Sequence, residues 1–257
     1  MDRTLEHILP NVQKPARYTG GEYNAVVKDR GKVDLRYALC FPDTYEIGMS
    51  NLGCRILYGM MNERPDVWCE RCFAPWGDME EEMRREGLLL YGLESGDPIA
   101  DFDMIGFSLG YEMSYTNVLN MLDLAGLELR SADRPELAPL VVAGGTCCYN
   151  PEPLAPFVDF IVLGEGEEVT LEYIDLYLQA REEGWSKEEF LEEATKIEGI
   201  YVPSFYEPVY RPDGTLESVD IKPGSGARET VTKRIVQNME TAYFPVKTII
   251  PSTEIVH

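Results

Sequence analysis

The sequence predicts an α/β protein with a mainly parallel sheet, helices on both faces of that sheet, and a C-terminal extended β segment. Short apolar runs alternate with amphipathic segments along residues 33–182, which is typical of βαβ units and therefore of parallel strands. Several of these runs are continuously apolar, as in strands that are buried on both faces. Hydrophobic residues make up 44% of the chain, which favours a buried core over disorder.

The elements follow from the spacing of apolar residues and from the Gly, Pro and Asp residues between them. The expected strands, which form a sheet of five or six, lie at residues 33–41, 67–73, 88–93, 104–108, 140–143 and 160–163. The expected helices lie at residues 49–63, 78–87, 115–125 and 167–181, and residues 184–198 are also rich in helix signals.

The character of the sequence changes near residue 199. A tyrosine-rich strand pattern at residues 201–210 precedes Arg211-Pro212-Asp213-Gly214, a turn signal, and residues 217–221 can pair back to form a hairpin. Residues 230–250 have the alternation of an extended segment. We therefore divide the chain into an N-terminal wrapping segment at 1–32, an α/β domain at 33–198, and a hairpin and extended linker at 199–257.

Composition excludes several classes of function. The formal net charge is −22, from 23 basic and 45 acidic residues, and such a surface repels phosphate backbones, so direct nucleic-acid binding is not expected. No signal peptide is recognised after Met1, and no apolar run approaches the roughly 20 residues that span a membrane. We expect a cytoplasmic protein without membrane contact.

The six cysteines offer weak signals for chemistry. Cys69 and Cys72 form a Cys-x-x-Cys, which is compatible with a redox pair or half of a metal site. However, this pair lies within an expected strand, no second such pair follows it, and the only histidines are His7 and His257. We therefore favour a structural role for Cys69 and Cys72. We predict no catalytic residue and no metal ligand.

Segments rich in glycine or small polar residues follow four of the expected strands. They lie at residues 41–48, 108–111, 144–146 and 164–167. Ligands of open α/β sheets bind outside the carboxyl ends of the strands, and glycine allows a close approach of the backbone. Each segment alone is compatible with an ordinary βα turn, but four at one edge predict a cofactor-shaped cleft.

The same segments resemble those of cobalamin-binding domains, which have a Rossmann-like, flavodoxin-like sheet. These domains carry Asp-x-His-x-x-Gly, then Ser-x-Leu, then Gly-Gly, where this chain has residues 43–48, Ser108-Leu109-Gly110 and Gly144-Gly145. Residues 144–167, with Asn150-Pro151-Glu152 and a Gly-Glu-Gly-Glu at 164–167, resemble radical SAM proteins that have such an N-terminal domain. The resemblance implies the cofactor-binding residues Asp43, Tyr45, Gly48, Ser108, Gly144, Gly145, Gly164, Glu165 and Gly166.

Two positions depart from the cobalamin pattern. Tyr45 stands where the histidine that ligates cobalt is expected, and a phenol is a poorer ligand than an imidazole. Gly110 replaces the leucine of Ser-x-Leu. We expect Tyr45 near the mouth of the cleft, and Asp43 to orient its loop by accepting backbone N–H groups.

The radical SAM resemblance implies a [4Fe-4S] cluster and S-adenosylmethionine in a downstream barrel, which would be this domain's partner. The Cys-x-x-x-Cys-x-x-Cys that holds such a cluster does not occur in this chain. We expect the sequence to be one part of a longer radical SAM enzyme and to be inactive alone.

Three functions remain open. The first is a cobalamin-type accessory domain, and the second is a docking or substrate-recognition domain that keeps the fold without cobalamin. The third, an independent flavin- or nucleotide-binding protein, is disfavoured because Gly164-x-Gly166 lacks the third glycine of the dinucleotide fingerprint.

Overall fold

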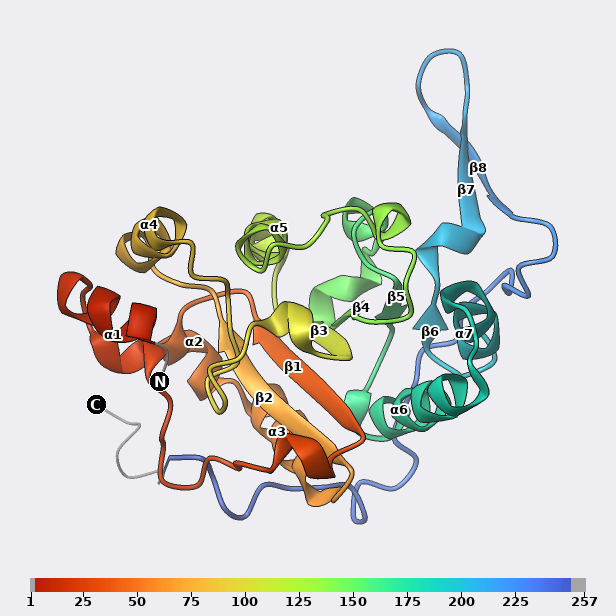
Figure 1. The fold of residues 1–257 in the computed structure, drawn as a ribbon. Helices are drawn as coiled ribbons and strands as arrows, with labels where there is room; N and C mark the ends of the chain where they lie inside the picture. The colour runs from red at the N-terminus through yellow and green to blue at the C-terminus, as the bar shows by residue number, and fades with distance from the viewer. Residues whose placement is uncertain (1–2, 251–257) are drawn as a thin grey trace.

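A computed structural model describes residues 3–250 and confirms the α/β fold with a mostly parallel sheet (Figure 1). Its six-stranded sheet has the order β2-β1-β3-β4-β5-β6. Neighbouring strands are parallel, except that β6 runs antiparallel to β5. The strands are β1 (Leu35–Phe41), β2 (Val67–Phe73), β3 (Met104–Ser108), β4 (Leu140–Gly144), β5 (Phe160–Val162) and β6 (Ile200–Tyr201).

Helices cover both faces of the sheet, as the βαβ pattern requires. They are α1 (Arg3–Ile8), α2 (Tyr45–Ser50), α3 (Leu52–Glu63), α4 (Gly77–Glu86), α5 (Tyr115–Leu124), α6 (Gly166–Glu183) and α7 (Lys187–Ala194). Helices α1, α4 and α5 pack on one face, and α3, α6 and α7 on the other (Figure 1). Alternate side chains of β1 enter the two cores: Ala38 and Cys40 face α4 and α5, while Tyr37 and Leu39 face α3 and α6.

The helix expected at residues 49–63 is two helices, with a break at Asn51. The Asn51 side chain accepts a hydrogen bond from Cys54 N at 2.9 Å and so caps α3, a position where Asn is strongly preferred. At the other end of α3, the Lys28 ammonium donates to the carbonyl oxygens of Asn62 and Arg64. A cation at the C-terminal end of a helix is favourable because the last carbonyl groups have no partner within the helix.

The strand predicted at residues 88–93 is wrong. This segment forms only one isolated bridge, between Tyr91 and Pro98, because its backbone groups bond to different elements. Leu90 N donates to Leu124 O, and Leu93 N donates to Arg71 O. Leu90 and Tyr91 are buried, so the apolar run reflects a loop that covers the outer edge of β2.

That edge is closed by side chains as well. Asn62 bonds to both the N–H and the carbonyl of Cys69, and Glu94 Oε2 accepts from Arg71 N at 2.7 Å. An uncovered edge strand offers unpaired backbone groups to other chains. Here the outward-facing groups of Cys69 and Arg71 find partners within the chain.

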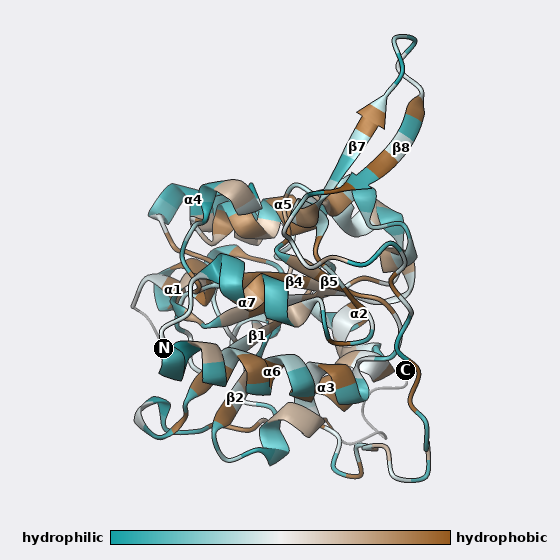
Figure 2. Ribbon diagram, turned by 90° about the vertical axis from the view of Figure 1, so that its right-hand side faces the viewer, coloured by the Kyte–Doolittle hydropathy of each residue, from teal (hydrophilic) through white to brown (hydrophobic). Residues whose placement is uncertain are grey.

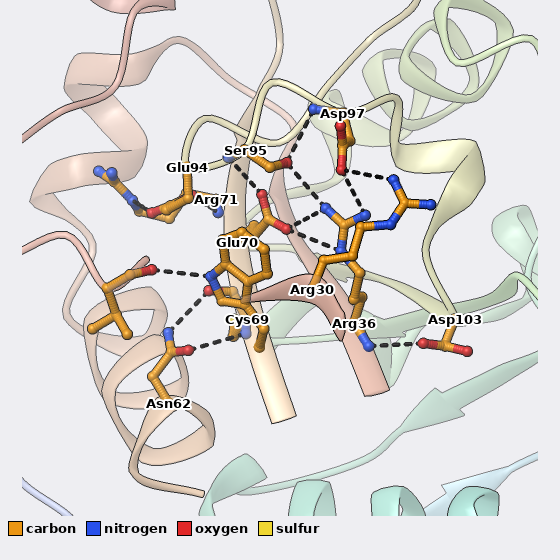
Figure 3. Close-up of polar contacts among 12 residues, drawn as sticks. Arg30, Arg36, Asn62, Cys69, Glu70, Arg71, Glu94, Ser95, Asp97 and Asp103 are labelled. Atoms are coloured by element: carbon orange, nitrogen blue, oxygen red, sulfur yellow. Dashed lines mark hydrogen bonds and ion pairs between the residues drawn. The ribbon is translucent and has the colours of Figure 1, made fainter. Parts of the chain in front are cut away.

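A buried charge network joins β1 and β2 to the loop at residues 92–97 (Figure 3). The Arg36 guanidinium pairs with Glu70 at 2.5 Å and with Asp97 at 2.8 Å, and the side chains of Arg36 and Glu70 are 8% and 0% exposed. The Cζ atom of Arg36 also lies 4.0 Å from the centre of the Phe102 ring. Ser95 N completes the network by donating to Glu70 Oε2.

The C-terminal part contains the predicted hairpin, formed by β7 (Tyr206–Tyr210) and β8 (Leu216–Ile221). It projects away from the body of the molecule (Figure 2). Residues 230–250 were expected to be extended, but they form no strand apart from an isolated bridge between Gly164 and Arg234. Within residues 3–250, no helix is both long and apolar enough to cross a membrane.

Replacing Arg36 tests the buried network. Arg36→Met leaves the fully buried carboxylate of Glu70 without its cation, so we expect the free energy of unfolding to fall by about 3–5 kcal/mol. Urea denaturation measures this change. Lys32→Met, which removes an exposed pair with Asp29, is the control and should cost less than about 1 kcal/mol. Equal effects of the two substitutions would contradict the proposed importance of the network.

Candidate functional site

An open cavity of about 230 Å³ lies at the carboxyl edge of the sheet. Strands β1, β3, β4 and β5 and helices α3 and α6 contribute its lining. Six of the nine predicted binding residues line it: Ser108, Gly144, Gly145, Gly164, Glu165 and Gly166. The loops after β3, β4 and β5 therefore converge, because parallel strands present their carboxyl ends at one edge.

The other three predicted residues, Asp43, Tyr45 and Gly48, do not line this cavity. Asp43 Oδ1 accepts from Thr44 N at 2.7 Å, and Asp43 Oδ2 accepts from the Tyr111 hydroxyl at 2.6 Å. A Cβ on Gly48 would lie 2.2 Å from Phe73 Cε1. Gly48 is thus required for the packing of α2 against β2.

Tyr45 is held away from the cavity, which corrects our placement of this residue at the mouth. Its hydroxyl donates to Glu22 Oε1 at 2.7 Å, and its ring packs edge-on against Phe73. Burial, together with the carboxylate of Glu22, raises the pKa of Tyr45 above the ordinary tyrosine value. The phenol is therefore protonated at neutral pH and already hydrogen-bonded.

A pair of buried tyrosines, which the sequence analysis missed, lies on the floor of the cavity. The hydroxyl groups of Tyr37 and Tyr173 are 2.9 Å apart. Burial raises the pKa of Tyr173 to about 12 and also raises the pKa of Tyr37 well above the ordinary tyrosine value, so both remain neutral. A Cβ on Gly106 would lie 1.9 Å from Tyr37 Oη. Glycine inside an apolar strand signals such a close approach, but it does not identify Tyr37 as the residue that approaches.

The glycines around the cavity have different roles. Gly145 and Gly164 have φ values of +116° and +112°, and a Cβ would lie within 2.3 Å of Leu109 O or Arg234 O, respectively. These two glycines permit close packing of one backbone segment against another. Gly144 differs, because its nearest neighbour would be Val162 Cβ at an ordinary 3.5 Å. A Cβ atom at residue 144 would therefore fit without a steric clash.

The first turn of α6 borders the cavity at Gly166 and Glu167. No side chain caps this end of the helix, so its first N–H groups are available to an acceptor. The Glu165 carboxylate does not point to them as a cap but accepts from Val236 N at 2.5 Å. The chemical character of the site is an apolar floor with hydroxyl groups and helix N–H groups at its rim.

All six cysteines are free and buried. Cys69 and Cys72 lie in β2, as expected for structural residues. Burial raises the pKa of Cys54 to about 11 and that of Cys148 to about 12. Among residues 3–250, no group of three or more His, Cys, Asp or Glu side chains is placed to hold a metal ion.

Comparison with known proteins places this arrangement in a family. Residues 53–203 match the family described as radical SAM proteins, N-terminal. The chain belongs to this family. The matched range includes the cavity residues contributed by β3, β4, β5, α3 and α6, whereas Asp43, Tyr45 and Gly48 precede it.

The radical SAM N-terminal domain also has a relative among curated proteins. It is similar to an uncharacterized protein of Methanocaldococcus jannaschii, with 28% identity over 147 residues. The matched stretch covers 56% of this chain and 27% of the relative. The similarity therefore extends to about a quarter of that protein.

Gly106→Ala tests the packing of the cavity floor. The added methyl group forces the Tyr37 ring to move, so we expect a loss of about 1–3 kcal/mol in unfolding free energy. The double variant Gly106→Ala/Tyr37→Leu should lose less than the sum of the single changes, because the clash is removed. Gly110→Ala, with no atom within 4 Å of its Cβ, is the control. Additive losses in thermal or urea unfolding would contradict the contact.

Thiol reactivity tests the structural role of the cysteines. At pH 8 the native protein should react slowly with Ellman's reagent, and all six thiols should react after unfolding in urea. For Cys54, a pKa of about 11 corresponds to an about hundredfold smaller thiolate fraction than in an unfolded chain. Rapid reaction of Cys69 or Cys72 in the native state would instead support a redox role.

Proposed function

We propose that this domain of a radical SAM protein binds part of a cobalamin-type cofactor in the cavity at its carboxyl edge. The single observation that carries the proposal is the position of the cavity. The strand order 2-1-3-4-5 reverses direction between β1 and β3, and ligands of such sheets bind at that point. Tyr37 and Leu39 of β1 and Ser108 of β3 line the cavity there.

The residues fit an apolar, flat portion of a cofactor better than they fit a ligated metal. Leu39, Val142 and Val162 provide apolar surface, and Ser108 and the α6 N–H groups provide polar contacts at the rim. The cavity volume of about 230 Å³ is below the roughly 300–1,000 Å³ of complete ligand sites. We therefore propose that it takes part of the cofactor, while the rest lies outside.

Cobalt ligation by the residues that the structure describes does not fit. Tyr45 is protonated, hydrogen-bonded to Glu22 and outside the cavity. His7 lies in α1, which packs on the other face of the sheet from α3 and α6, and His257 is outside the described residues. In this proposal the cofactor is thus held by packing and hydrogen bonds, and no residue among 3–250 ligates its metal.

The [4Fe-4S] cluster and S-adenosylmethionine belong, in this proposal, to a separate catalytic domain of the parent enzyme. The family name and the absence of Cys-x-x-x-Cys-x-x-Cys from this sequence support that assignment. Reductive cleavage of S-adenosylmethionine needs a cluster with one open iron, and this domain would supply binding and orientation only.

A second candidate is a docking domain without cobalamin. Large apolar side chains are exposed on the loops and short helices at the carboxyl edge: Ile47, Leu52, Tyr111, Met113 and Tyr149. Met113 is 85% exposed. Clustered exposed apolar residues mark interaction surfaces, and the catalytic domain of the parent protein is the proposed partner.

A cobalamin titration distinguishes the two candidates. We expect about micromolar affinity for the wild-type chain and at least an about tenfold weaker affinity for Gly144→Leu, whose side chain occupies the cavity. Changes in the visible absorption spectrum of cobalamin measure the binding. Gly77→Leu is the matched control, because Gly77 has open space around its Cβ and lies outside the cavity.

The wild-type result decides between the functions. If the wild-type chain does not bind cobalamin, the cofactor proposal is wrong and the docking function remains as the candidate. If Gly144→Leu and Gly77→Leu bind equally well, the cofactor lies elsewhere and the cavity assignment is wrong.

A further inference from the structure

The β7–β8 hairpin stands apart from the main sheet (Figures 1 and 2). It is tied to the body at its base, where Lys222 N donates to Phe205 O at 2.9 Å and the Tyr206 hydroxyl donates to Arg228 O at 2.7 Å. Tyr210 and Leu216 near its tip are 61% and 51% exposed. Two strands alone form a marginal sheet in water, so the hairpin would be stabilised by another strand.

An open groove of about 910 Å³ runs along one side of this hairpin. Its walls include Val219, Asp220 and Ile221, which are consecutive residues of β8. Consecutive side chains of a strand point to opposite faces. A groove that contacts all three therefore runs along the edge of β8 rather than over one face of the hairpin.

The pairing register shows which backbone groups face this groove. The bond from Lys222 N to Phe205 O makes residues 205 and 222 a hydrogen-bonded pair. In antiparallel strands such pairs alternate with non-hydrogen-bonded ones. The pair Pro208 and Val219 is therefore non-hydrogen-bonded, as is the pair Tyr206 and Ile221. The N–H and carbonyl groups of Val219 and Ile221 consequently point outward, along the groove.

The two outer edges of the hairpin are not equivalent. At the corresponding outward position of β7 stands Pro208, which has no N–H group and blunts that edge. On β8, the outward groups of Val219 and Ile221 have no backbone partner within residues 3–250. The β8 edge, and not the β7 edge, is thus suited to accept a further strand.

The side chains that line the groove favour a positively charged strand. Three carboxylates, Glu152, Asp220 and Glu229, lie along it, and no lysine or arginine is among the described residues that line it. Tyr149, Tyr201 and Tyr206 also line the groove. Guanidinium and ammonium groups interact favourably with both carboxylates and tyrosine rings.

A second copy of the chain fits this groove poorly. Residues 206–221 carry four carboxylates and one arginine, and the whole chain has a net charge of −22. Pairing of two β8 edges would bring like charges together, which is destabilising.

We propose that the β8 edge and its groove bind an extended, positively charged segment of a partner protein, which adds to the hairpin as a third strand. The backbone groups of Val219 and Ile221 supply the strand pairing, and the carboxylates and tyrosines supply the selection for arginine or lysine side chains. This mode of recognition combines main-chain affinity with side-chain specificity.

The test uses a fluorescein-labelled peptide of alternating arginine and threonine, titrated with the whole chain at about 0.15 M salt, where distant charge attraction is screened. We expect binding by fluorescence anisotropy and slower amide hydrogen exchange at Val219 and Ile221. An otherwise identical glutamate peptide should not bind. Val219→Pro removes one outward N–H without removing a bond of the hairpin itself, and it should weaken binding about tenfold.

Charge selection has a matched control within the hairpin. Asp220 and Glu207 are cross-strand partners, but only Asp220 lines the groove. Asp220→Asn should weaken binding, and Glu207→Gln should leave it nearly unchanged. Circular dichroism checks that Val219→Pro retains the fold.

Two outcomes would overturn the proposal. One is equal binding by a basic peptide whose alternate backbone amides are methylated, because this would reduce the interaction to charge attraction. The other is protection of Val219 and Ile221 in the absence of peptide, accompanied by concentration-dependent dimerisation, which would make a second copy the occupant.

Discussion

Two consecutive charged residues in a buried edge strand constrain the architecture around β2. Glu70 and Arg71 are adjacent in β2, and both are nearly inaccessible to solvent. Because neighbouring side chains of a strand face opposite sides, each charge needs partners on its own side of the sheet. A buried charge without a partner is strongly destabilising, so the chain must bring counter-charges to both faces.

The partners come from segments far apart in the sequence. Arg71 pairs with Glu22 from the N-terminal segment and with Glu94 from the loop after α4. Burial raises the pKa of Glu94. For Glu22, burial has the same effect, but it is outweighed by the charge of Arg71 and by hydrogen bonds, including those to Arg71 and Tyr45, so its pKa is lowered. The same Glu22 accepts the Tyr45 hydroxyl. Glu22 therefore connects the charge pair of β2 to Tyr45, the first residue of α2.

This coupling explains what sequence analysis could and could not predict. Apolar runs identified five of the six sheet strands. The glycine-rich and small polar segments after the strands, together with the cobalamin resemblance, identified six cavity residues, because the runs and the segments are both local signals. The run at residues 88–93 misled us, since burial against an edge produces the same composition as burial within a sheet. The position of Tyr45 depends on Glu22 and Arg71, and the tyrosine pair depends on a contact 136 residues apart in sequence. No local pattern contains such information.

The other strand edges of the molecule are protected, and this sets the open edge of β8 apart. At β2, the side chains of Asn62 and Glu94 form hydrogen bonds with the outward backbone groups. At the opposite end of the sheet, β6 has only two residues, so little edge is exposed. Pro208 blunts β7. Natural proteins limit open edges because these promote association. Against that background, the uncovered edge of β8, bordered by tyrosines and carboxylates, has the features of a binding surface rather than of an unprotected strand.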